Sequence, residues 1–391
     1  MKKTVSKFLS VAVLALATLG TSCSSDDSSN TSSTFVLVQN DLKGDINDGE
    51  VILRANQTYN LTGRLIVKDG ATLTIEAGAR IVASSPSETS PAIRYIAVAQ
   101  GGKINVQGTA TKPVVMTAET TNPGAWGGLV ICGKAPINKG LTASAEVSDL
   151  TYGGTIAADN SGSIRYLRIE YSGYAYNADK EFNGLSLFGV GSGTTIDYVQ
   201  IYEGSDDGIE WFGGTVNASH LVVYNTSTMV GDDLFDWTEG WVGTGNFWYG
   251  KRTNAGNRGV EADNNSNNHL ATPISNPTIN NLTLISSGSS TGNENQGMKL
   301  RVGTKAKFDN VVLANWTTGF DVQHDESVGF VGTDLKATNV KFVNVTNKAV
   351  GKNTAGTAVN VDGVYTENTS ATGAGNGETL PTWAQGWTTG F

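Results

Sequence analysis

A four-residue pattern recurs through the second half of this chain and constrains its fold more than any other feature. Each copy alternates apolar, polar and apolar residues, which is the period of a β-strand. The copies return at steps of 22 to 39 residues and are Gly184–Leu187, Gly208–Trp211, Leu234–Trp237, Gly259–Ala262, Gly297–Leu300, Gly319–Val322 and Ala358–Val361. Repetition at this period indicates stacked coils, each of which buries its apolar side chains against its neighbours.

A second apolar pattern precedes the first within each repeat. Its copies are Ile164–Ile169, Ile196–Ile201, His220–Val223, Ile279–Leu284, Phe308–Leu313 and Ala337–Phe342. Short strands joined by Gly and Asn turns predict an all-β protein, a single-stranded right-handed parallel β-helix (a solenoid) over residues 35–391. The unequal steps between copies argue against a β-sandwich or a propeller.

Three segments break the repeat. Gly140–Asn160 looks like an insertion and Asn254–Asn276 is rich in Asn, so we expect both to be loops off the face of the coils. Leu380–Phe391 holds two Trp and a Phe. Because the last coil of a solenoid exposes unpaired strands, we expect this segment to be an aromatic C-terminal cap over that end.

The N-terminus has the composition of an export signal. Residues 1–22 combine a basic start with an apolar stretch too short to span a bilayer, as in a signal peptide. The sequence around Cys23 resembles a lipoprotein signal, in which cleavage leaves Cys23 to carry the lipid. Residues 23–34 would then form a flexible Ser/Asp tether to the membrane. A Ser/Asp run after a lipidated Cys resembles surface-export signals, which favours the outer face of the outer membrane; a periplasmic spacer is the alternative.

The charge balance excludes one class of function. The chain carries a net charge of −9, and only 16% of its residues are charged. An acidic balance argues against a nucleic-acid partner. The second cysteine, Cys132, lies in an apolar run, where we expect a buried and unreactive thiol.

The polar position of the first pattern should form a column on the outside of the solenoid. Its members are Ser186, Glu210, Asp236, Glu261, Lys299 and Asp321. Carboxylates stacked about 5 Å apart repel one another. A bound cation, a protonated carboxyl group or a basic side chain such as Lys251, Arg252, Arg258 or Lys299 would relieve that repulsion.

Each way of relieving the repulsion selects its own candidate residues. Oxygen ligands favour calcium, and the metal candidates are Asp206, Asp207, Asp232 and Asp233. A carboxyl group that stays protonated is a general acid, and the catalytic candidates are Glu210, Asp236, Glu261 and Arg258. The third reading is structural, a surface ladder neutralised by its neighbours.

Aromatic residues lie in the same stretch. Alternation places Trp211 and Trp237 inward. Trp241, Trp248 and Tyr249 fall among Gly residues, so we expect them in exposed loops, where rings beside carboxylates would bind a sugar by stacking.

Several runs resemble a known family. Leu73–Gly78 and Gly102–Thr109 look like the pectate-lyase-like β-helix superfamily. Together with Trp126–Asn138 and Asp206–Gly214, they are similar to surface lipoproteins of Gram-negative bacteria that carry such a β-helix. Asp206-Asp207 also resembles the paired acids of polygalacturonase-type glycosidases, but the Gly-His-Gly of those enzymes is missing here. The resemblance implies a fold and a location at the cell surface, and no particular reaction.

These observations favour a non-catalytic surface lipoprotein that binds or presents an extracellular ligand. A glycan bound with calcium is the leading ligand, and an outer-membrane transporter is the expected protein partner. Two alternatives stay open: a polysaccharide lyase or glycoside hydrolase acting over residues 203–263, and a structural or adhesive scaffold.

Overall fold

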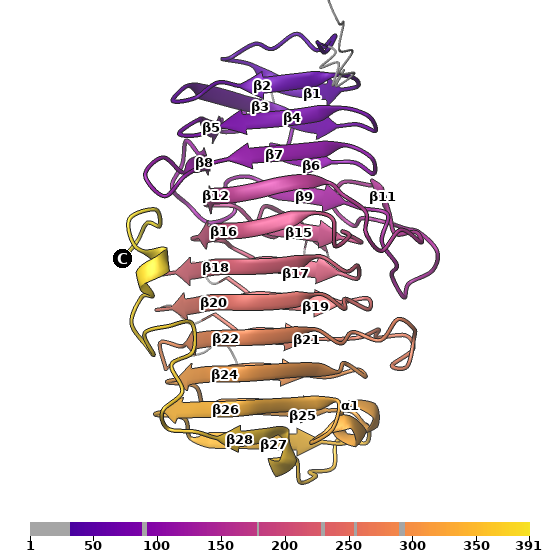
Figure 1. Cartoon of the computed structure of the whole chain (residues 1–391), viewed down its shortest axis with the longest axis vertical. Helices are drawn as coiled ribbons and strands as arrows, with labels where there is room; N and C mark the ends of the chain where they lie inside the picture. The colour runs from indigo at the N-terminus through magenta and orange to yellow at the C-terminus, as the bar shows by residue number, and fades with distance from the viewer. Residues whose placement is uncertain (1–31, 88–91, 178–179, 228–230, 254–255, 289–293) are drawn as a thin grey trace, which may run out of the picture. The chain divides into compact units, whose positions relative to one another are not determined.

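Parallel strands wound into a right-handed solenoid make up the body of the protein (Figure 1). The computed structural model describes residues 32–87, 92–177, 180–227, 231–253, 256–288 and 294–391, so the predicted signal peptide and the predicted lipid site Cys23 lie outside the described residues. Within these ranges, 24 strands form one continuous sheet. The predicted parallel β-helix is confirmed. Among the described residues, no helix is long and apolar enough to cross a bilayer.

The first coils use short strands except for the ten-residue β3. These are β1 (Leu42–Ile46), β2 (Glu50–Leu53), β3 (Thr58–Val67), β4 (Thr72–Glu76), β5 (Arg80–Ala83), β6 (Tyr95–Val98), β7 (Lys103–Gln107) and β8 (Val114–Ala118). Strands β7 and β8 pair with successive halves of β12 (Gly162–Glu170), so from β12 onward two short strands become one long strand.

Two stacks of strands then continue to the end of the solenoid. The short-strand stack is β9 (Leu129–Cys132), β15 (Leu185–Phe188), β17 (Ile209–Phe212), β19 (Phe235–Thr238), β21 (Val260–Ala262), β23 (Gln296–Leu300), β25 (Thr318–Gln323) and β27 (Asn347–Lys352). The long-strand stack continues from β12 through β16 (Thr195–Tyr202), β18 (Asn217–Asn225), β20 (Thr244–Arg252), β22 (Thr278–Ile285), β24 (Ala306–Ala314), β26 (Leu335–Val343) and β28 (Tyr365–Glu367).

Apolar ladders inside the coils form the core. Leu185, Ile209, Phe235 and Val260 are paired in register from one coil to the next, and none is exposed to solvent. Burying a side chain of this size contributes roughly 1.5–3 kcal/mol. One predicted copy of the four-residue pattern is wrong. The strand that follows β25 in the stack is β27, where Val350 pairs with Asp321, and the predicted copy Ala358–Val361 lies in the segment after β27.

The long strands bend at one residue each. That residue has a left-handed backbone with φ between 50° and 59°, and the set is Tyr166, Tyr198, His220, Phe247, Asn281, Asn310 and Asn339. Asn tolerates this conformation, whereas an aromatic residue there is strained. Stacking offsets the strain, because the rings of Tyr166 and Tyr198 lie 4.3 Å apart and those of Tyr198 and His220 lie 4.2 Å apart.

The C-terminal segment runs along the side of the solenoid, so the expected end cap is wrong. Residues 368–391, the C-terminal strap, climb past the long strands to the level of β16 and β18 (Figure 1). Trp387 and Ala384 of the strap are buried in a cluster with outward-facing apolar side chains of the long strands, among them Val222 and Ile285. Those side chains need cover from water, which explains the position of the strap.

A different segment closes the C-terminal end. Residues 353–364 follow β27, and their side chains Val361 and Val364, the latter in the 3₁₀ turn η1 (Asp362–Val364), join the core. A second 3₁₀ turn, η2 (Thr382–Ala384), lies in the strap.

The predicted insertion at 140–160 is confirmed, because this segment leaves the repeating coils. It carries the small hairpin β10 (Ala143–Ser144) and β11 (Thr151–Tyr152), and its side chain Tyr152 packs on Phe188 of the short-strand stack. The other departures are the hairpin β13 (Ala175–Asn177) with β14 (Lys180–Glu181), the loop after β21 and the helix α1 (Asp325–Phe330).

Candidate functional site: an acidic ladder on the short-strand stack

The predicted polar column exists. Register places Ser186 beside Glu210, Glu210 beside Asp236, and Asp236 beside Glu261. The column continues through Lys299 to Asp321. We call this column, with the acidic residues of the turns that precede it, the acidic ladder.

The turns before the strands add a second row of acids. The backbone N–H of Asp233 donates to Asp207 Oδ1 at 2.9 Å, and the N–H of Arg258 donates to Asp233 Oδ1 at 2.7 Å. Each carboxylate is therefore held by the backbone of the next coil. This arrangement fixes the second row beside the column.

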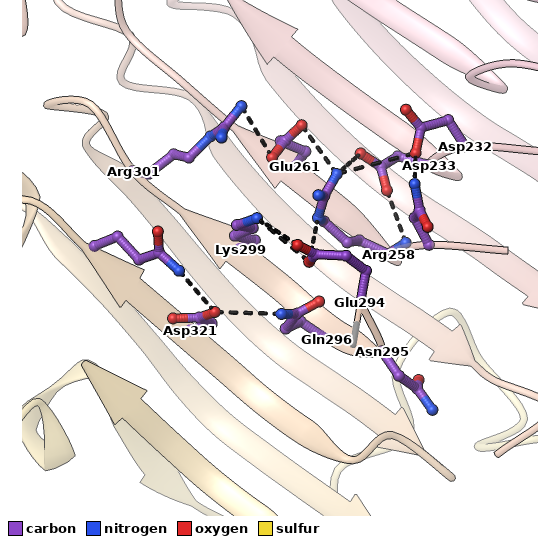
Figure 2. A network of polar contacts seen from close by, with 12 residues as sticks. Asp232, Asp233, Arg258, Glu261, Glu294, Asn295, Gln296, Lys299, Arg301 and Asp321 are labelled. Carbon is purple, nitrogen blue, oxygen red and sulfur yellow. Dashed lines mark hydrogen bonds and ion pairs between the residues drawn. The ribbon is translucent and has the colours of Figure 1, made fainter. Parts of the chain in front are cut away.

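Basic side chains neutralise the C-terminal half of the ladder (Figure 2). Arg258 Nη1 lies 3.0 Å from both Asp233 Oδ2 and Glu261 Oε2, and its Nε lies 3.1 Å from Glu294 Oε2. Lys299 Nζ lies 3.0 Å from Glu294 Oε1. Here the structural reading of the ladder holds.

The neutralising side chains are only partly those expected from sequence. Arg258 and Lys299 reach the ladder, and so does Arg301, whose Nη2 lies 3.1 Å from Glu261. Lys251 and Arg252 do not, because they belong to β20 in the other stack. The Lys251 ammonium lies over the Tyr224 ring, and the buried Arg252 lies over the Trp316 ring.

These ion pairs set the protonation of the C-terminal half. Burial opposes the charge of Arg258, but Asp233 and Glu261 outweigh it and raise the pKa of that guanidinium. Burial also acts on Glu294, yet hydrogen bonds from Arg258 and Lys299 lower its pKa to about 2. Arg258 therefore stays charged and cannot accept a proton as a base.

The N-terminal half of the ladder has no such partners. Asp207, Glu210 and Asp236 each place a carboxylate oxygen within 4.8 Å of the other two. Among the described residues, no Lys or Arg forms an ion pair with any of the three. Glu210 accepts one hydrogen bond, from Asn183 Nδ2 at 2.6 Å. We call these three residues the uncompensated trio.

Burial and mutual repulsion act together on the trio. Burial raises the pKa of all three carboxyl groups, and neighbouring carboxylates raise it further. For Asp236 the strongest of these neighbours is Glu210. A divalent cation or a shared proton would relieve this repulsion.

The metal candidates predicted from sequence are partly brought together. Carboxylate oxygens of Asp206, Asp207 and Asp232 lie within 4.8 Å of one another. Asp233 is the exception, because Arg258 already holds its carboxylate. Asp207 belongs both to this group and to the trio.

Two acids beside the ladder escaped the sequence analysis. Glu146 of the 140–160 insertion lies near enough to Glu210 to raise its pKa. Glu294 stands before β23, as Asp206 and Asp232 stand before β17 and β19. Glu294 could have been found from the sequence, because an acid also precedes the strands that carry Glu210 and Asp236. Nothing in the repeat pointed to Glu146.

The predicted aromatic platform is wrong. Trp241 and Trp248 have no exposed surface, and Tyr249 is 1% exposed. Trp248 stands on β20 in register with Leu221 and Leu282, so it fills an inward position of the core. The Trp211 ring stacks against it at 4.9 Å. The Gly residues that suggested a loop, Gly245 and Gly250, lie within β20, and a Cβ there would clash with the Trp248 ring and with Leu234 respectively.

Comparison with known proteins identifies a domain type. A family model described as a pectate-lyase like beta helix domain matches residues 44–388. No curated protein and no solved structure matches the chain. A domain of this type is compatible with a carbohydrate-related or surface role.

Proposed function

The chain belongs to the pectate-lyase-like β-helix family, and on that basis we propose that it binds an extracellular glycan through calcium held by the acidic ladder. The observation that carries the proposal is the uncompensated trio of Asp207, Glu210 and Asp236. Carboxylate oxygens are the ligands that calcium prefers, and a divalent ion would remove the repulsion among the three acids, of which Asp207 is buried and the other two are partly buried. Through its open coordination positions the ion would accept hydroxyl or carboxylate oxygens of a glycan.

The proposed location rests on the N-terminal sequence. Lipid on Cys23 would anchor the protein, and the Ser/Asp tether favours the outer face of the outer membrane. An outer-membrane transporter that takes up the glycan is the proposed partner.

A non-catalytic role is favoured over β-elimination. A lyase needs a base, and the arginines nearest the ladder, Arg258 and Arg301, are held in ion pairs that raise their pKa values. Neither can release a proton at neutral pH.

A glycoside hydrolase is the second candidate, and one observation favours it. The pKa values of Glu210 and Asp236 are raised, which is the property of a general acid. If this candidate is right, a glycan panel will release shorter products, and Glu210→Gln will abolish their release.

Calcium titration of the melting temperature tests the main proposal. We expect calcium to raise the melting temperature of the wild-type protein and to leave Glu210→Gln/Asp236→Asn unchanged. Asp321→Asn is the matched control, since it removes a carboxylate from the same column but outside the trio. If calcium does not change the melting temperature of the wild-type protein, the proposed calcium site is wrong.

The glycan panel completes the test, with binding measured with and without calcium. Calcium-dependent binding without products supports a receptor. No binding under either condition would move the assignment to a scaffold.

A further inference from the structure

An exposed apolar run lies at the end of the solenoid where β1 and β2 form the first coil (Figure 1). Val36 is 80% exposed, Val38 is 47% exposed and Leu37 is 37% exposed. In the described part of the chain, the other exposed large apolar residues stand singly, at Leu141, Ile156, Tyr176, Val242, Leu270 and Phe391. Isolated apolar residues are common on protein surfaces, whereas contiguous ones mark contact surfaces. We call Val36–Val38 the apolar tip.

Hydrogen bonds hold the chain on both sides of the apolar tip. Before it, the carboxylate of Asp48 accepts hydrogen bonds from the N–H and from the hydroxyl group of Thr34, both at 2.7 Å. After it, Gln39 Nε2 donates to the carbonyl oxygen of Thr58 at 2.8 Å. Phe35, which directly precedes the tip, packs on the core. The tip is therefore held on the outside of the first coil by the fold itself.

The first coil does not share the acidic excess of the chain. Between Phe35 and Lys68 there are four acidic and four basic residues, whereas the whole chain carries a net charge of −9. The acids are Asp41, Asp45, Asp48 and Glu50, and the basic residues are Lys43, Arg54, Arg64 and Lys68. This end can therefore approach a negatively charged surface without the repulsion that the rest of the chain would meet.

The apolar tip also lies close to the predicted lipid site. Phe35 follows Cys23 by twelve residues. A stretch of that length reaches at most about 40 Å when it is fully extended. Lipid on Cys23 would keep the tip within that distance of the bilayer. Because a tether raises the local concentration of a second contact, an apolar contact that is weak by itself suffices.

We infer that the apolar tip enters the bilayer interface, so that the first coil rests on the membrane and the solenoid stands away from it. This inference rests on the lipid anchor of the function proposed above and adds a second membrane contact to it. Five strand pairings separate β1 from β17, which carries Glu210. At about 4.8 Å for each coil, the acidic ladder would begin about 24 Å beyond the first coil, clear of the lipid head groups.

A protein partner suits the apolar tip less well than lipid. The tip belongs to no strand, so it presents side chains and not a strand edge. A stable protein interface uses about 20–30 residues on each side, far more than the three of the tip. A contact with the bilayer interface needs only a few apolar side chains when a lipid anchor acts beside it.

The test places an environment-sensitive fluorophore on Leu37→Cys in the full lipidated chain, reconstituted in liposomes of neutral or anionic lipid. Cys132 is buried and the lipid blocks Cys23, so the label goes to the new thiol. We expect quenchers attached to the lipid to lower its emission about twofold or more. The matched control is Leu270→Cys, which replaces an exposed apolar residue in the loop after β21 and should keep its emission. Adding Val36→Ser/Val38→Ser to the Leu37→Cys chain should remove the quenching.

Mass spectrometry of Cys23 separates this inference from the anchor on which it rests. A lipidated chain that floats with the liposomes but shows no quenching at Leu37→Cys, or equal quenching at Leu270→Cys, would overturn the contact alone. A chain without lipid on Cys23 would overturn the anchor and the contact together. A blue shift at Leu37→Cys that grows with protein concentration and needs no liposomes would overturn the contact in favour of self-association.

Discussion

The uncompensated trio makes an unusual prediction: removing one of its charges should stabilise the protein in the absence of calcium. Asp236 lies between Glu210 and Glu261 in the column, and among the described residues nothing donates a hydrogen bond to its carboxylate. The change Asp236→Asn keeps the size of the side chain. It therefore removes repulsion and no attractive contact.

Coulomb's law gives the size of the effect. Carboxylate oxygens of the trio lie within 4.8 Å of one another. At an effective dielectric constant near 20, two unit charges at that separation repel by about 3.5 kcal/mol. Because raised pKa values leave the trio partly protonated, we expect Asp236→Asn to stabilise the protein by roughly 1–3 kcal/mol. For a protein of this size that is a rise in melting temperature of about 1–4 °C.

Calcium should make the wild-type protein more stable than Asp236→Asn, the reverse of the order expected in EDTA. A ligand at 100 times its dissociation constant stabilises the folded state by about 2.7 kcal/mol, and Asp236→Asn would lose much of that gain. The assay is thermal unfolding at pH 7.5 in EDTA and in millimolar calcium. Asp321→Asn is the control, because its carboxylate accepts hydrogen bonds from Gln296 and Gln323 and its removal should not stabilise. If Asp236→Asn lowers the melting temperature in EDTA, the electrostatic reasoning is wrong.

Four further results are expected. In EDTA the melting temperature should fall as pH rises from about 4 through the raised pKa values, because the folded protein binds those protons more tightly than the unfolded chain; Asp236→Asn should flatten that dependence. Arg258→Gln removes an ion-pair partner from Asp233, Glu261 and Glu294, and among the described residues it leaves the buried Asp233 with no other, so it should cost about 3–5 kcal/mol in urea unfolding. Trp248→Ala removes a ring from the core, so it should lower the free energy of unfolding by about 3–5 kcal/mol and leave glycan affinity unchanged. A loss of glycan affinity without that loss of stability would show that Trp248 binds the glycan. Trp387→Ala should release the C-terminal strap, seen as faster proteolysis after residue 368, and unchanged proteolysis would contradict the packing described here.

Local pattern accounts for the features that sequence predicted well. The alternation around Glu210 and Asp236 places the apolar residues inside and the acids outside, and the repeat aligns one coil with the next. The missed strand β20 shows where the pattern fails. Gly245, Trp248 and Gly250 take the places that Ile, Leu and Val hold in neighbouring coils, so a strand looked like a loop.

The sequence by itself determined the solenoid, its two apolar ladders and the order of charges along the outer column, because these follow from a short period repeated at near-regular steps. Only the tertiary structure decided which charges are compensated. Arg258 and Lys251 both stand between Asp236 and Glu261 in sequence, but they lie on different faces of the coil, and only Arg258 reaches the acids. Tertiary structure also decided that Trp387 packs on the side of the solenoid, since a period of two shows which residues face outward but not what covers them.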